Sequence, residues 1–410
     1  MASVDRLSNL PDAIICHILS FLPTKLSVST SVLSKRWSSL WAHVPVLDFE
    51  SGESTALDIV TRFMQLYKVQ RINAFRISYA GRHDDLSKSQ LETCIAVAIL
   101  HNVKELRVCV PVLPRGILTC ETLVDLCLRN CGDIIPVTDT VCLPALKTLH
   151  LISVKYKSDK TLVHLLSGCP VLEELTVRCF PTWVCCHITS PTLKKLTIND
   201  HCKVKVDTPS LRFLKLENCV PLEGDVSDGT LDSLTEAEID IDKLTIMGLD
   251  VAVFSHYVLR FVSRLNNVKY LKLSSLLDPN YSFSFLPSYT KFHNLTRLEL
   301  NGDGRFLSYF LANADNLEVL IIGRVKSGMW LLEQETKCLS SHLRAVRIGG
   351  FGCAEHEFEL IIRYLLWNAK VLRRMEIYSS RHDGTDLKAK FDERISLFPR
   401  GSVACELAFH

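Results

Sequence analysis

The chain has 410 residues, of which 47% are hydrophobic and 22% are charged, a composition that favours a folded protein with a large core over a disordered one. Its formal charge is only +2, so there is no global electrostatic reason to expect binding to nucleic acid or to an anionic membrane. No apolar segment reaches the about 20 residues that span a bilayer, and none follows the N-terminus as in a signal peptide. We therefore expect a protein of the nucleus or cytoplasm, without a membrane or nucleic-acid partner.

The sixteen cysteines predict no metal site or catalytic centre. Without a secretion signal they are expected to be reduced thiols. Neither the spacing of Cys127 and Cys131 nor the Cys185-Cys186-His187 string matches a zinc-binding pair of pairs. Phosphate-binding, metalloprotease and nucleophile-elbow motifs are also missing, so no catalytic residue or cofactor is predicted. An enzyme with Cys185 or Cys186 as its nucleophile is an alternative, but no activating histidine and carboxylate follow in a recognisable order.

The first fifty residues predict three short helices. Pro11 suits a first helical position, Asp12 favours a helix N-terminus, and Pro23 ends the first helix. Thr24 and Ser34 are candidate N-caps of the second and third helices. Apolar residues recur with helical spacing: Ile14, Ile15, Ile18, Leu19 and Leu22, then Leu26, Val28, Val32 and Leu33, then Trp37, Leu40, Trp41 and Val44. A unit of roughly 40 residues barely supports its own core, so we expect another surface to cover it.

Particular strings punctuate these helices: Leu10-Pro11-Asp12, Ile18-Leu19, V-L-S-K-R-W at 32–37 and Leu40-Trp41. The segment resembles the F-box, which docks onto a Skp-type adaptor and thereby joins a cullin-based ubiquitin ligase. The resemblance implies one set of adaptor-binding residues: Leu10, Pro11, Ile14, Ile18, Leu19, Val32, Leu33, Trp37 and Leu40. A helical cap for the following domain is the alternative, although a cap needs the apolar pattern and not the L-P-D or S-K-R-W strings.

From about residue 70 a single phrase recurs: apolar, two variable, apolar, one variable, apolar. Its copies follow each other about every 24 residues, within the roughly 20 to 29 typical of leucine-rich repeats. The closing alternation predicts a short strand with one inward face, and stacked copies predict a parallel sheet. The phrase starts at Ile72, Val103, Leu123, Leu146, Leu172, Leu193, Leu211, Leu234, Val268, Leu295, Leu317, Leu343 and Leu372. This pattern predicts an α/β solenoid with strands on the concave face and helices or turns on the convex face.

The repeats also predict convex helices and two structural cysteines. Amphipathic stripes predict convex helices over 253–265 and 358–366. Cys131 and Cys219 stand three residues after their phrases, at the Asn/Cys position of the repeat consensus, and we interpret both as structural.

The pattern weakens between the phrases at Leu234 and Val268, which are separated by the longest interval. Ala237 also replaces a large apolar residue there. We therefore expect the solenoid to be interrupted or subdivided within 220–265.

The C-terminal part resembles an FBD domain in C-L-S-S-H-L-R-A-V-R-I at 338–348, a helix at 355–369, V-L-R-R-M-E-I at 371–377 and F-P-R-G-S-V-A-C-E-L-A-F at 398–409. With the N-terminal match, nearly the whole chain resembles plant F-box, leucine-rich-repeat and FBD proteins. The expected division is an F-box over 1–50, repeats over 51–335 and an FBD domain over 336–410. Physically, the last part is expected to continue the solenoid and to cover its end with a final strand.

The variable residues of each strand are expected to line the concave face, where charged and aromatic side chains suit a protein partner. Candidate substrate contacts are Phe213, Lys215, Glu236, Glu238, Tyr270, Lys272, Arg297 and Arg347. Residues 223–242 carry eight acidic and no basic side chains, which suggests either selection of a basic partner segment or a solvated surface.

The resemblance implies a substrate-recruiting subunit of an SCF-type ubiquitin ligase, with a Skp-type adaptor, a cullin and a protein substrate as partners and with no chemistry of its own. A leucine-rich-repeat scaffold that binds or inhibits a partner without ubiquitination is the second hypothesis. Adaptor binding distinguishes the two. The sequence does not identify the substrate.

Overall fold

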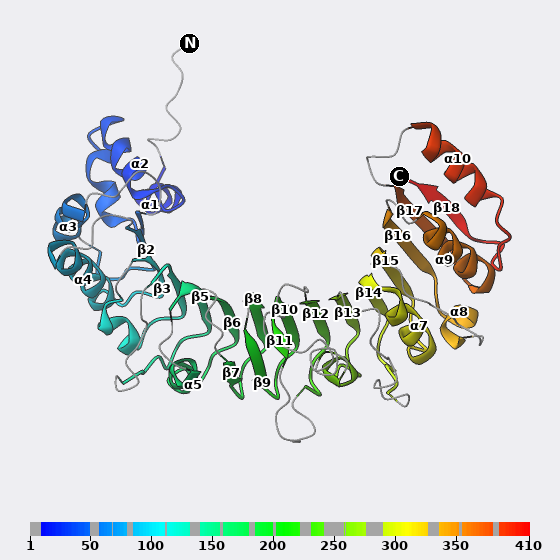
Figure 1. The fold of residues 1–410 in the computed structure, drawn as a ribbon. Coiled ribbons are helices and arrows are strands. Elements are labelled where there is room, and N and C mark those ends of the chain that lie inside the picture. Colours follow the sequence, from blue (N-terminus) through cyan, green and yellow to red (C-terminus); the bar gives the residue numbers. More distant parts are fainter. Residues whose placement is uncertain are drawn as a thin grey trace, which may run out of the picture. The chain divides into compact units, whose positions relative to one another are not determined.

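A computed structural model of the chain forms two units, Met1–Leu193 and Lys194–His410, which are described separately below (Figure 1). The structure describes residues 10–49, 57–67, 69–79, 85–110, 113–131, 140–155, 159–179, 185–199, 202–221, 231–241, 258, 260–275, 290–326, 336–351, 355–379 and 385–410.

The N-terminal helices are present, but their ends differ from the expected ones. Helix α1 is Asp12–Leu19 and α2 is Thr24–Ser29, and two 3-10 helices follow at Thr30–Val32 and Trp37–His43. Pro11 and Pro23, both in extended backbone, occupy the N-cap positions of α1 and α2. Arg36 occupies the corresponding position before Trp37–His43, so the predicted caps are wrong for Thr24 and Ser34.

The hydroxyl of Thr24 has another role. It lies inside α2, is buried, and accepts a hydrogen bond from the backbone N–H of Asp48 at 2.7 Å. Asp48 belongs to the first strand, β1 (Val46–Phe49), which the sequence analysis did not anticipate. The threonine thus joins the helical segment to the sheet. Rules based on neighbouring residues do not predict this hydrogen bond, because its partners are 24 residues apart.

Six strands of the first unit pair in parallel in chain order. They are β1, β2 (Ala74–Ser78), β3 (Glu105–Cys109), β4 (Asp125–Arg129), β5 (Thr148–Val154) and β6 (Glu174–Cys179). Helices α3 (Leu57–Leu66), α4 (Asp85–Leu100) and α5 (Asp159–Ser167) and a 3-10 helix, Arg115–Thr119, lie between them in sequence. In Figure 1, α3 and α4 lie on one side of β2 and β3.

The second unit continues the same pattern with parallel strands in chain order. They are β8 (Lys195–Asn199), β10 (Phe213–Glu217), β12 (Glu236–Ile241), β13 (Tyr270–Ser275), β14 (Arg297–Asp303), β15 (Val319–Lys326), β16 (Ala345–Phe351), β17 (Arg374–Ser379) and β18 (Glu406–Phe409). Every phrase found in the sequence forms a strand, so the repeat prediction is confirmed. The final strand expected in the C-terminal part is also present.

The expected interruption near 220–265 is wrong for the strands. Strand β12 pairs in unshifted register with β10 on one side and β13 on the other. Ala237 is completely buried in the inward row between Leu214 and Leu271. Backbone pairing and packing between the two neighbouring leucines therefore keep this repeat in register, although Ala237 has a small side chain.

The return segments are partly helical. Helices α7 (Gly304–Asn313), α8 (Lys337–Ser341) and α9 (Glu355–Asn368) lie on one side of β14 to β17, and α10 (Thr385–Ser396) contacts α9 (Figure 1). The helix predicted at 358–366 is confirmed by α9. Of the helix predicted at 253–265, residues 253–257 and 259 lie outside the described residues.

Other returns are strands, contrary to the expectation of helices or turns. They are β7 (Cys185–Thr189), β9 (Lys203–Asp207) and β11 (Val220–Pro221). In β9 the sequence K-V-K-V-D alternates with a period of two and contains β-branched valines, which is the pattern of a strand.

The inward row of leucines forms the core. At β10, for example, Leu214 and Leu216 of the strand and the preceding Leu211 are all fully buried. Asn130 and Asn218 follow β4 and β10 in the left-handed backbone region, with φ of 50° and 58°, and turn the chain away from the sheet.

The cysteines after these turns are buried, which supports their interpretation as structural residues. The thiol of Cys131 donates to the carbonyl of Arg129 at 3.4 Å, and that of Cys219 donates to the carbonyl of Glu217 at 3.2 Å. Burial raises the pKa of Cys131 to about 11. This thiol is therefore protonated at neutral pH and is a poor nucleophile.

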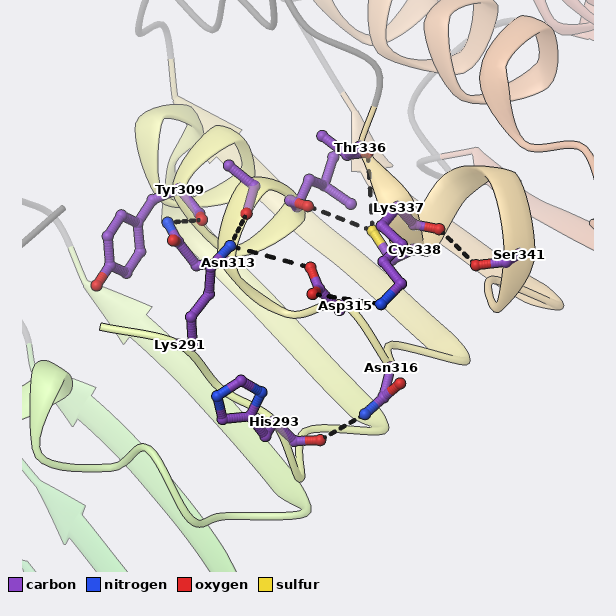
Figure 2. Close-up of polar contacts among 12 residues, drawn as sticks. Lys291, His293, Tyr309, Asn313, Asp315, Asn316, Thr336, Lys337, Cys338 and Ser341 are labelled. Carbon is purple, nitrogen blue, oxygen red and sulfur yellow. Dashed lines mark hydrogen bonds and ion pairs between the residues drawn. The ribbon is translucent and has the colours of Figure 1, made fainter. Parts of the chain in front are cut away.

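Polar contacts between the loops hold successive repeats together (Figure 2). The carboxylate of Asp315 lies 4.0 Å from the ammonium of Lys291 in the preceding repeat and 3.9 Å from that of Lys337 in the following one. The buried thiol of Cys338 donates to the carbonyl of Leu311 at 3.3 Å. These contacts fix α8 directly on the preceding repeat.

Replacing Asn218 tests how strongly the left-handed turns support the stack. Asn218→Ala should lower the unfolding free energy by about 1 kcal/mol, because alanine tolerates positive φ poorly, whereas Asn218→Gly should be nearly neutral. The measurement is the urea midpoint of the full-length protein by circular dichroism. Equal midpoints for the two variants would contradict this role of the turn.

Candidate protein-binding surfaces

The two strings that punctuate the N-terminal helices contact each other in the structure. Arg36, from the S-K-R-W string, donates from Nε and Nη2 to Oδ1 of Asp12 at 2.9 and 2.6 Å. Its Nη2 also donates to the carbonyl of Leu10 at 2.5 Å. Because one guanidinium holds both the side chain and the backbone of the L-P-D string, the contact fixes where α1 begins relative to the last 3-10 helix.

A small apolar core lies beneath this contact. It contains Ile15, Leu19, Trp37, Leu40 and Val44, and Leu10 packs against it. Leu19, Trp37 and Leu40, which the sequence analysis assigned to adaptor binding, are thus 1%, 6% and 6% exposed. In this structure these three support the surface from below.

Other predicted adaptor-binding residues lie on the surface. Ile14, Ile18, Val32 and Leu33 are 46%, 38%, 88% and 65% exposed, and Pro11 is exposed as well. Large apolar side chains are expensive to leave in water, so several of them on one small helical unit indicate an interaction surface.

Two exposed apolar residues of the same segment were missed. Phe21 is 75% exposed and Leu26 is 53% exposed. Phe21 follows Ile18 by three residues, a spacing that places both on one side of a helical turn and that could have identified it. We define Ile14, Ile18, Phe21, Leu26, Val32 and Leu33 as the N-terminal apolar surface.

The N-terminal helices are joined closely to the following repeats within the first unit. Strand β1 pairs with β2 over four residues. The rings of Trp41 and Phe63 lie 5.0 Å apart, and the hydroxyl of Tyr67 donates to the carbonyl of Val44 at 2.6 Å. Hydrogen bonds and aromatic packing together hold the segment in a fixed orientation on the first strands.

The eight predicted substrate contacts all come together on one face of the second unit. Strand register places Phe213, Glu236, Tyr270 and Arg297 in one row across four strands. The next row contains Lys215, Glu238 and Lys272, and it continues through Glu299 and Ile321 to Arg347. We call the face that carries these two rows the outward face.

Charges alternate along the second row and form ion pairs. Lys215 lies 3.4 Å from Glu238, and Lys272 lies 2.6 Å from Glu299. A second pair joins Lys215 to Glu217 of its own strand at 2.8 Å, and these contacts raise the pKa of Lys215. The positive and negative charges of the row therefore largely offset each other, and their signs alternate from strand to strand.

Aromatic rings lie among these charges. The guanidinium of Arg297 lies 5.5 Å from the ring centre of Tyr270, and the ammonium of Lys195 lies 6.0 Å from that of Phe213. Partial burial and the nearby Glu299 and Glu238 carboxylates raise the pKa of Tyr270 to about 12. Its hydroxyl is therefore protonated at neutral pH and donates to Glu299 at 3.4 Å.

The acidic stretch has a different environment from the one its sequence suggests. Strand β12, with Glu236 and Glu238, lies between strands that contribute Lys215 and Lys272, and Lys215 pairs with Glu238. Glu223, Asp225, Asp228 and Asp242 lie outside the described residues. Within the described face, the adjacent strands offset the negative charge, which weakens the argument for a basic partner.

No group of three or more potential metal-ligating side chains occurs among the described residues. Cys186, one of the two cysteines considered as a nucleophile, is buried in β7. Within the same described ranges, no helix is long and apolar enough to cross a membrane.

Comparison with known proteins identifies three matching family models. Residues 7–49 match the F-box domain, residues 91–249 match the LRR repeats of FBD-associated F-box protein At5g56370, and residues 336–377 match the FBD. The chain is 32% identical to F-box/LRR-repeat protein At4g14096 of Arabidopsis thaliana, over 98% of this chain and 94% of that protein. It is 30% identical to F-box/FBD/LRR-repeat protein At1g78750 of the same plant, over 98% and 96% of the two chains.

The chain belongs to the plant F-box/FBD/LRR-repeat family. An F-box in general binds a Skp-type adaptor, and the matched residues 7–49 of this family member include the whole N-terminal apolar surface. The FBD match begins at Thr336, immediately before α8, and ends within β17. In this family member the FBD therefore has the strand-and-helix pattern of the repeats before it.

The ion pairs of Glu376 on β17 give a prediction about pH. Its carboxylate accepts from Nε of Arg347 and lies 2.7 Å from Nε of Arg374, and the hydrogen bond from Arg347, followed by the charges of both arginines, lowers its pKa. A carboxylate with a lowered folded pKa stabilises the fold above its ordinary pKa of about 4.3 and loses this effect as the pH falls through the folded value.

Glu376→Gln should therefore destabilise the protein most at pH above the ordinary glutamate pKa, and the difference from wild type should shrink progressively as the pH is lowered below it. Urea midpoints of both proteins across this range test the expectation, and the same series at high salt should show a smaller difference. A difference that does not change with pH would show that the two arginines do not stabilise this carboxylate.

Proposed function

We propose that this protein recruits substrates to an SCF-type ubiquitin ligase. Its F-box binds the Skp-type adaptor, the adaptor joins a cullin, and the outward face of the repeats holds a protein substrate. The observation that carries the proposal is the N-terminal apolar surface, which remains exposed although the chain buries an apolar core beneath it. A helical cap of the solenoid would turn such side chains toward the repeats.

In this role the protein contributes position and not chemistry. A lysine of the bound substrate is kept near the activated ubiquitin, and holding two reactants together raises their effective concentration. A fixed orientation of the F-box on the first repeats suits this task, and the β1–β2 pairing and the Tyr67 hydrogen bond provide it within the first unit. No catalytic residue of this chain is required, and the complex would act in the nucleus or cytoplasm.

The proposal assigns one role to each part of the chain. Residues 1–50 bind the adaptor, residues 51–335 bind the substrate, and residues 336–410 continue the repeats and cover their end. Leu10, Leu19, Trp37 and Leu40 would act as the packed support of the adaptor-binding surface.

A scaffold that binds a partner without ubiquitination is the competing function. It would use the same outward face and the same alternating charges, so the repeats do not discriminate between the two functions. The N-terminal apolar surface favours the ligase function, because binding a partner through the repeats alone does not require a second exposed apolar surface.

Co-purification of a plant Skp-type adaptor and a cullin with the full chain tests the proposal. Ile14→Asp combined with Ile18→Asp should reduce adaptor recovery by on the order of a hundredfold, since both charges would have to be buried in the contact. Val403→Asp is the control, because Val403 is an exposed apolar residue that lies near the C-terminus, away from the N-terminal apolar surface in sequence. Its adaptor recovery should equal that of wild type.

Failure of the folded wild-type chain to capture the adaptor would overturn the ligase function. Equal recovery with wild type and the double variant would show that α1 does not make the contact. Circular dichroism of each protein confirms that it is folded.

A further inference from the structure

The alternating charges of the outward face are interrupted at β15 in both rows and at β16 in the first row. Where the earlier strands carry Lys272 and Glu299 in the second row, β15 carries Ile321, and the first row contains Val319 and Ala345. All three side chains are partly exposed. We call Val319, Ile321 and Ala345 the apolar gap.

Small residues extend the apolar gap along the same two strands. Gly323 follows Ile321 on β15, and Gly349 follows Arg347 on β16. A side chain at Gly323 would collide with the carboxamide of Asn301, and one at Gly349 would approach the side chain of Tyr378 to 3.3 Å. Both positions therefore leave little room for a side chain.

Charged residues surround the apolar gap, and they carry an excess of positive charge. Arg297 precedes it on β14, and Arg347 and Arg374 follow it on β16 and β17. Glu376 lies 2.7 Å from Arg347 and from Arg374, so one carboxylate serves two guanidiniums. Glu299 is already paired with Lys272.

This arrangement specifies the chemistry of a partner. An isolated apolar side chain on a surface needs no explanation, but three adjacent ones with charged residues on both sides offer a place where a partner can exclude water. Strong contacts in protein interfaces usually consist of such a central apolar anchor with a polar rim. Arginines at the rim select carboxylates, because opposite potentials attract and like charges are costly.

We propose that the apolar gap binds a segment of the protein substrate in which one large apolar side chain is flanked by acidic residues. The apolar side chain covers Ile321, Val319 and Ala345, and the flanking carboxylates face Arg297 on one side and Arg347 and Arg374 on the other. The inference rests on the proposed function, since it names the class of substrate segment that the repeats recognise.

Three short fluorescent peptides provide the test. The first has leucine between acidic flanks, the second has serine in place of leucine, and the third keeps leucine between lysine flanks. Fluorescence anisotropy measures their binding to the full-length protein with and without the Skp-type adaptor. The first peptide should bind on the order of tenfold or more tightly than either of the others.

Two variants and a control locate the site. Ile321→Asp should weaken binding of the first peptide by on the order of tenfold or more. Arg374→Glu, at an exposed rim position, should shift the preference from acidic toward lysine flanks. Thr197→Asp introduces the same charge in the second row on β8, away from the apolar gap, and should leave binding unchanged.

Binding that does not depend on leucine or on the acidic flanks would overturn the inference, as would unchanged binding by folded Ile321→Asp. The absence of binding by all three peptides would also count against it. Because peptide binding is measured with and without adaptor, loss of adaptor capture alone would refute the proposed ligase function and not this site.

Discussion

Parallel pairing of short strands in matched register is the constraint on which the rest of this structure depends. Once Leu214 on β10 lies opposite Ala237 on β12 and Leu271 on β13, every inward position is fixed by geometry, and so is every outward one. The inward row becomes the core, and the outward rows become a continuous surface. Alternating charge, cation–π contacts and the apolar gap all follow from which residues occupy those outward rows. A shift of one residue would exchange the two faces.

The N-terminal segment obeys a different constraint. A helical unit this small cannot enclose all of its apolar side chains, so it divides them between an inner cluster around Trp37 and an outer surface that includes Ile14 and Val32. Arg36 fixes the geometry by binding Asp12 and the Leu10 carbonyl. The two motif strings therefore contact each other. The L-P-D string begins α1, and the S-K-R-W string supplies the arginine that binds it.

Sequence reasoning succeeded where the pattern was local and periodic. Each leucine phrase correctly predicted one strand of the parallel sheet, because a period-two alternation with buried leucines is typical of a strand with one buried face. It failed where the deciding partner was distant: Thr24 caps nothing and instead accepts from Asp48, and strand pairing keeps the repeat of Ala237 in line. The return strand β9 was missed because helices or turns were expected on that side. The outward positions could be predicted, but not the ion pair that offsets Glu238 or the break in the charges at Ile321, since both depend on neighbours many residues away.

We infer that the N-terminal apolar surface is uncovered in the free chain and is covered when a Skp-type adaptor binds. Amide hydrogen exchange of the full-length protein, measured with and without purified adaptor, tests it most directly. The predicted result is slower exchange in α1 and α2 upon adaptor addition, with little change in β10 to β17. Unchanged exchange in α1 and α2 at saturating adaptor, or slower exchange confined to the repeat strands, would contradict the claim.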